Sequence, residues 1–369
     1  MARNDAISRS IVAAVLKTPP RERLSLIKRV LIVLSAFFTL FQLRLTRIKD
    51  DVFERLRTKS WEMDDEAYRS SFSGDEPLET KGDMGYSGSS FFTTKDGKYL
   101  IKSVPRQFEH SYFRDDLLEP YAKHMEENAR SLLIRITDFL GWKHFSIGGI
   151  LGLVPTYHIT MENLLIGQDE ADSAGGGDWE TFDLKPADYF FPERDIAGGK
   201  LASEATKSRL ADKFDDKIVL SQEQHDIFIR QLEQDTTLLA SHNAVDYSLF
   251  LVRIPLSNPQ NPFADEPDHD NAPEAPDFPP FAPPSPPTWR TGVRSADGKY
   301  VFRAQILDFF WAKHKVTPKL FTFLIKAWNL IDRKGPMSIT TTPDEYRERF
   351  LRMCEHFVEV KEDGEDEAS

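Results

Sequence analysis

The sequence predicts an α+β fold in which antiparallel strands are flanked by helices. Residues 91–102 combine two runs of strand-forming side chains with an Asp-Gly turn, which is the pattern of a β-hairpin. Two later stretches, 221–242 and 343–360, have the apolar periodicity of amphipathic helices. With 369 residues, of which 40% are hydrophobic, the chain can bury the core of one large domain or of two medium ones.

The hairpin is preceded by glycines and ends in a lysine. Along the second strand, Lys102 alternates onto the same face as Leu100, where an apolar side chain would be expected. The stretch 82–90 contains three glycines and three serines, which allow backbone N–H groups and hydroxyls to approach an anion such as phosphate. The alternative is a glycine-rich surface hairpin whose last lysine extends into water. The hairpin alone leaves both interpretations open.

The other predicted elements follow in order along the chain. Helices are predicted at 111–130, 221–242 and 343–360, and strands at 154–162, 246–254 and 299–307. Ser221 and Gln224 form a capping pair at the start of the second helix, and Pro343 lies in the first turn of the third. The apolar side of that third helix consists of Tyr346, Phe350, Met353, Cys354 and Phe357.

Two acidic segments and a glycine-rich loop interrupt this order. Residues 256–289 hold eleven of the 23 prolines and no Lys or Arg, so they are expected to form a disordered insert between two strands. The tail 359–369 is also acidic, and 169–179 is predicted to be a surface loop. Together the insert and the tail account for all but one of the net charge of −12. The folded body is therefore nearly neutral.

The N-terminal region 1–44 is predicted to be a basic and apolar helical extension. Its apolar run at 30–43 has 14 residues, fewer than the roughly 20 that span a bilayer. We expect a buried or interfacial helix there rather than an anchor, and we discount a mitochondrial targeting segment. Cys354 is the single cysteine, which excludes an intramolecular disulfide and indicates a reducing, cytosol-facing compartment.

Four short motifs place polar residues at the ends of predicted strands. They are "TMENLL" at 160–165, "FDLKPAD" at 182–188, "NAVDYSLFLVRI" at 243–254 and "AQILDFFWAK" at 304–313. In the second motif, Asp183 and Lys185 share one face if the backbone is extended. Any one of these aspartates alone is most simply a turn or capping residue.

Taken together and in this order, the motifs resemble a phosphatidylinositol phosphate kinase. The resemblance also includes "GYSGSSFF" and "YLIKS" in the hairpin, "PDEYRERF" at 343–350 and "VFERLRTKSWEMDDEAYRSSFS" at 52–73, and it covers about 45–358. It implies a two-lobed α+β kinase fold, similar to SAICAR synthase, with ATP in the cleft. The N-terminal lobe would be 45–160, and the C-terminal lobe 161–358 with the insert 256–289.

The resemblance also implies roles for individual residues. Lys102 corresponds to the ATP-binding lysine, and Asp308 to the aspartate that binds Mg²⁺. Asp246 would orient or deprotonate the inositol hydroxyl, with Asp183 and Lys185 near the transferred phosphate. The adenine-binding hinge would consist of Met161, Glu162 and Asn163, and the loop over the phosphates of Gly85, Ser87 and Gly88.

The stretch 303–335 carries a net charge of +5 and occupies the position of the family's substrate and membrane determinant. Lys313, Lys315 and Lys319 are expected to bind an anionic phosphoinositide membrane, because each basic residue near such a surface contributes about 1 kcal/mol. The alternative is a solvated helix face. The resemblance thus implies a cytoplasmic, peripherally membrane-associated protein that can form a homodimer, with no nucleic acid among its partners.

One motif departs from the family. Pro186 and Ala187 follow Lys185 where the family has glycine and serine, so a turn is stiffened and a backbone donor is lost. Two hypotheses follow. The chain is either a lipid kinase that converts a phosphatidylinositol monophosphate into a bisphosphate, or a catalytically weak member that binds phosphoinositides or acts as a scaffold. The sequence does not indicate which isomer is the substrate.

Overall fold

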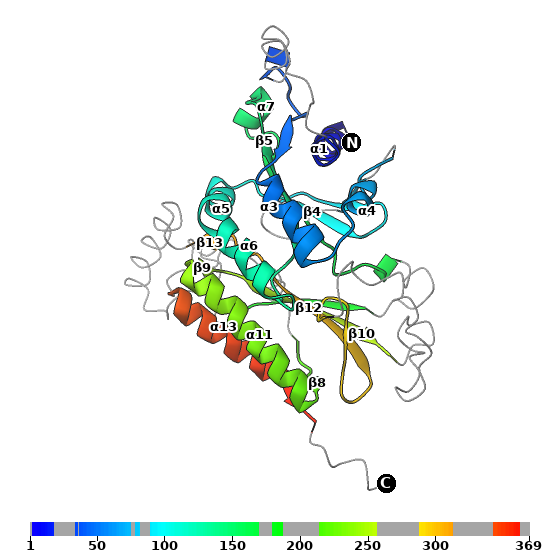
Figure 1. Cartoon of the computed structure of the whole chain (residues 1–369), viewed down its shortest axis with the longest axis vertical. Helices are drawn as coiled ribbons and strands as arrows, with labels where there is room; N and C mark the ends of the chain where they lie inside the picture. The colour runs from blue at the N-terminus through cyan, green and yellow to red at the C-terminus, as the bar shows by residue number, and fades with distance from the viewer. Residues whose placement is uncertain are drawn as a thin grey trace, which may run out of the picture. The chain divides into compact units, whose positions relative to one another are not determined.

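The computed structural model describes residues 2–17, 34–35, 37–74, 78–81, 89–169, 179–186, 214–256, 288–312 and 342–361 (Figure 1). The chain divides into two compact units. Unit 1 comprises Met1–His110 and Arg135–Asn163, and unit 2 comprises Ser111–Ile134 and Leu164–Ser369. This division differs from a single boundary between 160 and 161, because the helical segment 111–134 belongs to unit 2.

Unit 1 is built on an antiparallel sheet of six strands in the order β1-β5-β6-β4-β3-β2. The strands are β1 (Leu45–Arg47), β2 (Leu78–Lys81), β3 (Phe91–Thr94), β4 (Tyr99–Ser103), β5 (Ile136–Trp142) and β6 (Tyr157–Glu162). The helices are α1 (Ala2–Val15), α3 (Asp50–Arg55), the π-helical turn η1 (Leu56–Ser60), α4 (Asp65–Ser70) and α7 (Ile147–Ile150), and α5 (Gln107–Tyr112) runs from unit 1 into unit 2.

The predicted hairpin is confirmed as β3 and β4. Phe91 pairs with Lys102, and the turn contains Gly97 at φ 69°, a conformation that favours glycine. The Asp96 carboxylate accepts hydrogen bonds from the hydroxyls of Thr94 and Ser71, both at 2.6 Å, which fixes the turn against the rest of unit 1.

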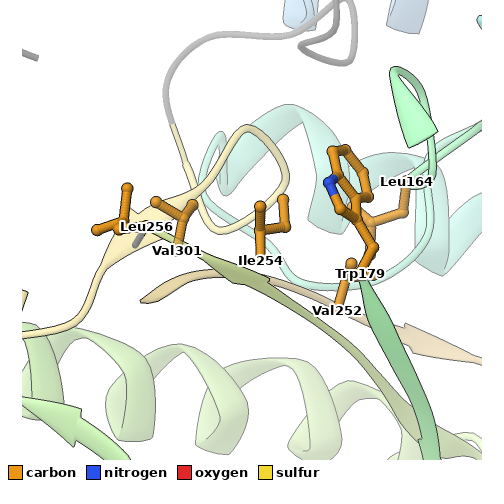
Figure 2. Close-up of a cluster of buried hydrophobic side chains, with 6 residues drawn as sticks. All are labelled: Leu164, Trp179, Val252, Ile254, Leu256 and Val301. Carbon is orange, nitrogen blue, oxygen red and sulfur yellow. The ribbon is translucent and has the colours of Figure 1, made fainter. Parts of the chain in front are cut away.

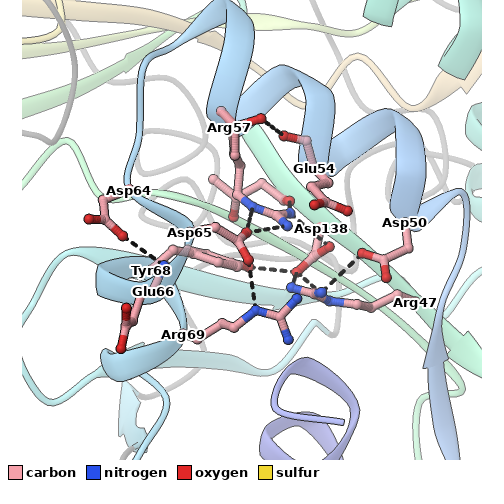
Figure 3. A network of polar contacts seen from close by, with 12 residues as sticks. Arg47, Asp50, Glu54, Arg57, Asp64, Asp65, Glu66, Tyr68, Arg69 and Asp138 are labelled. Atoms are coloured by element: carbon pink, nitrogen blue, oxygen red, sulfur yellow. Dashed lines mark hydrogen bonds and ion pairs between the residues drawn. The ribbon is translucent and has the colours of Figure 1, made fainter. Parts of the chain in front are cut away.

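A network of buried charges holds the sheet of unit 1 to its helices (Figure 3). At its centre, Asp138 on β5 is fully buried and accepts hydrogen bonds from Arg47 at 3.0 Å, Arg57 at 3.2 Å and the Tyr68 hydroxyl at 2.7 Å. Arg57 also contacts Asp65 at 2.8 Å. Burial opposes the charged form of Arg57, but the negative charges of Asp138 and Asp65 and the hydrogen bond to Asp65 together outweigh it and raise the pKa of the guanidinium.

The described part of unit 2 contains three small sheets and two long helices. A four-stranded antiparallel sheet has the order β11-β12-β10-β7, β13 pairs with β9, and β14 pairs parallel with β8. The strands are β7 (Glu180–Leu184), β8 (Ile218–Leu220), β9 (Ala244–Val245), β10 (Ser248–Pro255), β11 (Val293–Arg294), β12 (Tyr300–Leu307), β13 (Trp311–Ala312) and β14 (Val358–Val360). The helices are η2 (Phe113–Leu117, π-helical), α6 (Leu118–Glu127), α11 (Gln222–Ser241) and α13 (Pro343–Phe357), the last two lying side by side (Figure 1).

Most element predictions in unit 2 are confirmed, with local corrections. The capping box of Ser221 and Gln224 begins α11 as predicted. The last helix ends at Phe357 rather than at 360, because Val358–Val360 leave the helix and pair with Ile218–Leu220. Strand β10 begins at Ser248, two residues later than predicted.

A hydrophobic cluster in unit 2 corrects the predicted limits of two loops (Figure 2). It consists of Leu164, Trp179, Val252, Ile254, Leu256 and Val301. Trp179 was assigned to the surface loop 169–179 and Leu256 to the insert 256–289, yet both side chains are buried. Trp289, at the other limit of the insert, is also buried and packs on Phe228. Burying a large apolar side chain lowers the free energy of the folded chain, so such residues at the ends of a loop pack into the core.

The predicted extension 1–44 contributes to the core of unit 1. Ile7, Ile11 and Val15 of α1 are buried, and the Ser10 hydroxyl accepts a hydrogen bond from the backbone N–H of Leu43. Across the described ranges, every helix is too short or too polar to cross a bilayer.

The interior of the proline-rich insert lies outside the described residues, but its limits suggest an experiment. Leu256 donates to the Lys299 carbonyl and Ala304 donates to the Trp289 carbonyl. Lys299 and Ala304 are five residues apart along extended chain that ends in β12, which corresponds to about 17 Å. We expect that replacing 258–287 by a Gly/Ser linker of about eight residues changes stability by only on the order of 1 kcal/mol, because closure entropy varies slowly with loop length. Thermal unfolding checks this, and a large fall in Tm would show that the insert packs on the body.

Candidate active site

Three strands of the unit 2 sheet bring predicted site residues to one end of that sheet. Strand β10 lies between β7 and β12, with Leu249 opposite Leu184 and Ser248 opposite Leu307. Lys185 directly follows β7, Asp308 directly follows β12, and Asp246 lies two residues before the start of β10. Because antiparallel neighbours are in register here, the end of β7, the start of β10 and the end of β12 coincide.

A second strand pair links the two aspartates. Just before Asp246, Val245 of β9 pairs with Trp311 of β13, which lies just after Asp308. The chain turns between Asp308 and Trp311, where the N–H of Phe310 donates to the Asp308 carbonyl at 2.8 Å. Asp246 therefore lies between β9 and β10, and Asp308 lies between β12 and β13, so each aspartate connects a strand of one sheet to a strand of the other.

Both aspartates have the left-handed backbone conformation. The φ angle is 70° at Asp246 and 63° at Asp308. Among residues with a side chain, Asp and Asn tolerate this region best, and most others are strained there. Such conformations cluster at functional sites because the surrounding structure must hold them in place.

Lys185 forms the closest contacts of the cluster. Its Nζ donates to Asp246 Oδ1 at 2.6 Å and to the Asp246 carbonyl at 2.9 Å, and only 9% of its side chain is exposed. Burial opposes the charged form, but the negative charges of Asp246, Asp308 and Asp183 outweigh it and raise the pKa of Lys185. Lys185 is therefore a cation at neutral pH. The structure thus gathers the four catalytic and metal-binding residues predicted in this unit.

Tyr346 supports this cluster from behind, a role that the sequence analysis did not assign. Its hydroxyl donates to the Tyr247 carbonyl at 2.5 Å, directly after Asp246, and its ring is buried against the Tyr247 ring. Burial first, and then the charges of Asp246, Tyr247 and Asp183, raise its pKa, so the phenol remains a donor. The sequence signal was the tyrosine within "PDEYRERF", which was assigned only to the apolar side of a helix.

We expect Tyr346→Phe to destabilise the chain by about 1–3 kcal/mol, because it leaves the buried Tyr247 carbonyl without its donor. The same change should loosen the backbone that holds Asp246. Tyr247→Phe is the matched control, since the buried Tyr247 hydroxyl has no hydrogen-bond partner among the described residues. Denaturant unfolding of both variants checks the difference, and equal stabilities would contradict the role of the Tyr346 hydroxyl.

In unit 1, Lys102 lies on β4 opposite Ile159 of β6. Tyr99 and Ile101 are buried on one face of β4, whereas Lys102 and Leu100 lie on the other, half-buried face. The Lys102 ammonium is 5.7 Å from the centroid of the Phe91 ring. The alternation predicted from the sequence is confirmed.

The predicted hinge residues are the end of β6 and the residue after it. The Glu162 carboxylate is buried and contacts Arg135 at 3.4 Å, and the Glu162 N–H donates to the Arg135 carbonyl. The N–H of Asn163 donates to the Lys98 carbonyl at 2.9 Å. Met161 is buried opposite Leu100. These two N–H groups are engaged within unit 1, so adenine recognition here would use other backbone groups.

The remaining predicted residues lie outside the described ranges. They are Gly85, Ser87 and Gly88 of the glycine-rich loop and Lys313, Lys315 and Lys319 of the basic stretch. Within the described ranges, no group of three or more His, Cys, Asp or Glu side chains could hold a metal ion. A single carboxylate such as Asp308 still suits Mg²⁺, which proteins commonly hold by one or two carboxylates together with substrate phosphates.

The cluster of a protonated lysine and three carboxylates is suited to phosphoryl transfer, which requires positioning and charge neutralisation. The sequence profile of the family described as Phosphatidylinositol-4-phosphate 5-Kinase matches residues 72–357. The chain belongs to this family. The match includes every predicted site residue and agrees with the resemblance, although it begins later than 45.

Relatives of this phosphatidylinositol phosphate kinase family member are distant. Over 185 residues the chain is 28% identical to phosphatidylinositol 4-phosphate 5-kinase type-1 beta of Gallus gallus and of Homo sapiens, a region that covers 48% of this chain and 30% of each relative. A probable phosphatidylinositol phosphate kinase of Dictyostelium discoideum is also 28% identical over 185 residues, with 22% of that relative covered. The matched region thus spans less than a third of these relatives.

Proposed function

We propose that this chain is a lipid kinase that transfers the γ-phosphate of ATP to an inositol-ring hydroxyl of a phosphatidylinositol monophosphate, giving a bisphosphate. The observation that best supports this proposal is the cluster in unit 2. There Lys185 contacts Asp246, and its pKa is raised also by Asp308, a second aspartate with left-handed backbone conformation. A lysine and carboxylates in this arrangement can supply the positioning and charge neutralisation that phosphoryl transfer requires.

Each residue of the cluster receives a role that suits its chemistry. The Asp246 carboxylate accepts a hydrogen bond from the attacking inositol hydroxyl and orients it, while Lys185 holds that carboxylate in place. Lys185 also offers positive charge to the phosphoryl group during transfer. Asp183 adds a carboxylate whose charge Lys185 balances.

The family resemblance supports nucleotide-binding roles for several further residues. Asp308 would hold Mg²⁺, which neutralises phosphate charge when it is bound. Lys102 would bind the phosphates of ATP, with Gly85, Ser87 and Gly88 over them. Met161, Glu162 and Asn163 would border adenine. A two-lobed fold similar to that of SAICAR synthase is part of this proposal.

The proposal also includes cytoplasmic, peripheral association with an anionic phosphoinositide membrane through Lys313, Lys315 and Lys319, and association as a homodimer. A second candidate function is that of a phosphoinositide-binding scaffold with weak catalysis. It is favoured by Pro186, a buried residue that follows Lys185 and has no N–H to offer a phosphate.

An assay with radiolabelled ATP and vesicles that contain each phosphatidylinositol monophosphate isomer separates the two functions. The kinase proposal expects a labelled bisphosphate from at least one isomer, and Asp246→Asn should reduce its formation by about 10²–10³-fold. Asn tolerates the same backbone conformation as Asp, and its side-chain oxygen can still accept the hydrogen bond from Lys185. Thermal unfolding of the variant checks that a fall in turnover does not come from lost stability. Vesicle binding without turnover on any isomer would favour the scaffold.

A further inference from the structure

Unit 1 carries a concentrated set of exposed apolar side chains. Within the described ranges, every exposed large hydrophobic residue belongs to one of two segments, 34–41 and 145–153. These residues are Leu34, Phe37, Phe38, Leu40, Phe41, Phe145, Ile150, Leu151 and Leu153. Single exposed apolar residues are ordinary, but a contiguous set marks an interaction surface.

The two segments lie against each other and are ordered by their own contacts. The N–H of Gly148 donates to the Thr39 carbonyl at 3.2 Å, and a Cβ at Gly148 would lie only 1.6 Å from the Leu40 carbonyl oxygen. Within the second segment, the Leu153 N–H donates to the Gly148 carbonyl at 2.9 Å. We call residues 34–41 and 145–153 together the apolar tip. It lies where the chain leaves β5 and forms α7 (Figure 1).

Basic side chains border the apolar tip. Lys17, Arg44 and Lys143 are exposed, and the N–H of Lys143 donates to the Arg44 carbonyl at 2.7 Å. Partial burial and the positive charges of Lys143, Arg44 and Lys17 lower the pKa of His144, so all three cations act on that ring. We call these three residues the basic collar.

Acidic residues are absent from the surrounding sequence. Neither 34–48 nor 139–161 contains an Asp or Glu, although the chain has 59 of them. The charge of this end of unit 1 is therefore positive in a chain whose net charge is −12.

We propose that the apolar tip inserts into the interface of an anionic lipid bilayer while the basic collar binds the lipid headgroups. Interfacial binding of this kind combines buried apolar area with attraction to anionic lipids. Protein interfaces, in contrast, are depleted of lysine, and their polar rims carry both signs of charge. The proposal goes beyond the kinase function, because this surface requires neither a phosphoinositide nor a nucleotide.

Sedimentation of the full chain with vesicles of phosphatidylcholine and phosphatidylserine tests the proposal without any phosphoinositide. Phe145 and Leu151 are 65% and 64% exposed, so the double variant Phe145→Glu and Leu151→Glu should fold. It should lose roughly tenfold or more of its partition into the vesicles. The double variant Arg44→Gln and Lys143→Gln should lose about fivefold for each residue, and added salt should weaken wild-type binding.

The matched control adds the same two charges elsewhere. Gln234 and Thr237 are exposed on α11 of unit 2, and Gln234→Glu with Thr237→Glu should bind as the wild type does. The proposal is overturned if wild-type chain fails to sediment with the anionic vesicles or if the tip variant sediments equally well. It is also overturned if sedimentation velocity shows that the tip variant dissociates a wild-type dimer while lipid binding is unchanged, because the tip would then be a protein interface.

Discussion

Replacing Asp138 by Asn should destabilise the chain by about 3–5 kcal/mol, because it removes the central carboxylate of a buried ion-pair network. Arg47 and Arg57 would keep only the partly exposed carboxylates of Asp50 and Asp65 as partners. The side chains of Asp138 and Arg57 are both fully buried, and that of Arg47 is 4% exposed. None of these charges can recover its hydration without opening unit 1. The expected result is a fall in Tm of many degrees, measured by thermal unfolding of the full chain.

Asp115→Asn is the matched control for this change. Asp115 also pairs with an arginine at 2.7 Å, but its side chain is 47% exposed and that of Arg114 is 39% exposed. Exposed pairs contribute about 0–1 kcal/mol, so this variant should unfold almost as the wild type does. If Asp138→Asn were as mild as Asp115→Asn, water would have to reach the network, and its proposed role in holding unit 1 together would be wrong.

The network also shows where sequence patterns are insufficient. Strand β5 was not predicted, and the partners of Asp138 are 91, 81 and 70 residues away along the chain at Arg47, Arg57 and Tyr68. A buried aspartate in an apolar run looks like an exposed residue until its partners are known. Local signals cannot supply partners that tertiary folding brings together.

The elements that were predicted correctly depend on local chemistry. The hairpin with its Asp-Gly turn and the capping box of α11 are determined by residues within a few positions of one another. In contrast, Lys185 and Asp246 are 61 residues apart, and their contact follows from the register of β7 and β10. Motif order identified these residues, but only the sheet explains why they meet.

The left-handed conformation at Asp308 makes a further substitution unusually informative. Asn tolerates φ near 63° almost as well as Asp does, so Asp308→Asn should keep the ligand-free Tm close to that of the wild type. It removes the negative charge that Mg²⁺ prefers. Under the kinase proposal, ATP with Mg²⁺ at a hundredfold excess over Kd should stabilise the wild type by about 2.7 kcal/mol, and ATP alone should stabilise it less. The variant should lose this Mg²⁺-dependent increment.

Asp308→Ala completes the experiment because it separates backbone strain from charge. Alanine at a left-handed position is strained by roughly 1–2 kcal/mol, so this variant should have a lower ligand-free Tm than Asp308→Asn while losing the same Mg²⁺-dependent increment. Thermal unfolding with ATP, with and without Mg²⁺, measures both effects on the same samples. If the Asn variant retains the full increment, Asp308 does not bind the metal. If the wild type itself shows no Mg²⁺-dependent increment, the scaffold function gains support over the kinase, because a transferase that uses Mg²⁺ with ATP must bind them together.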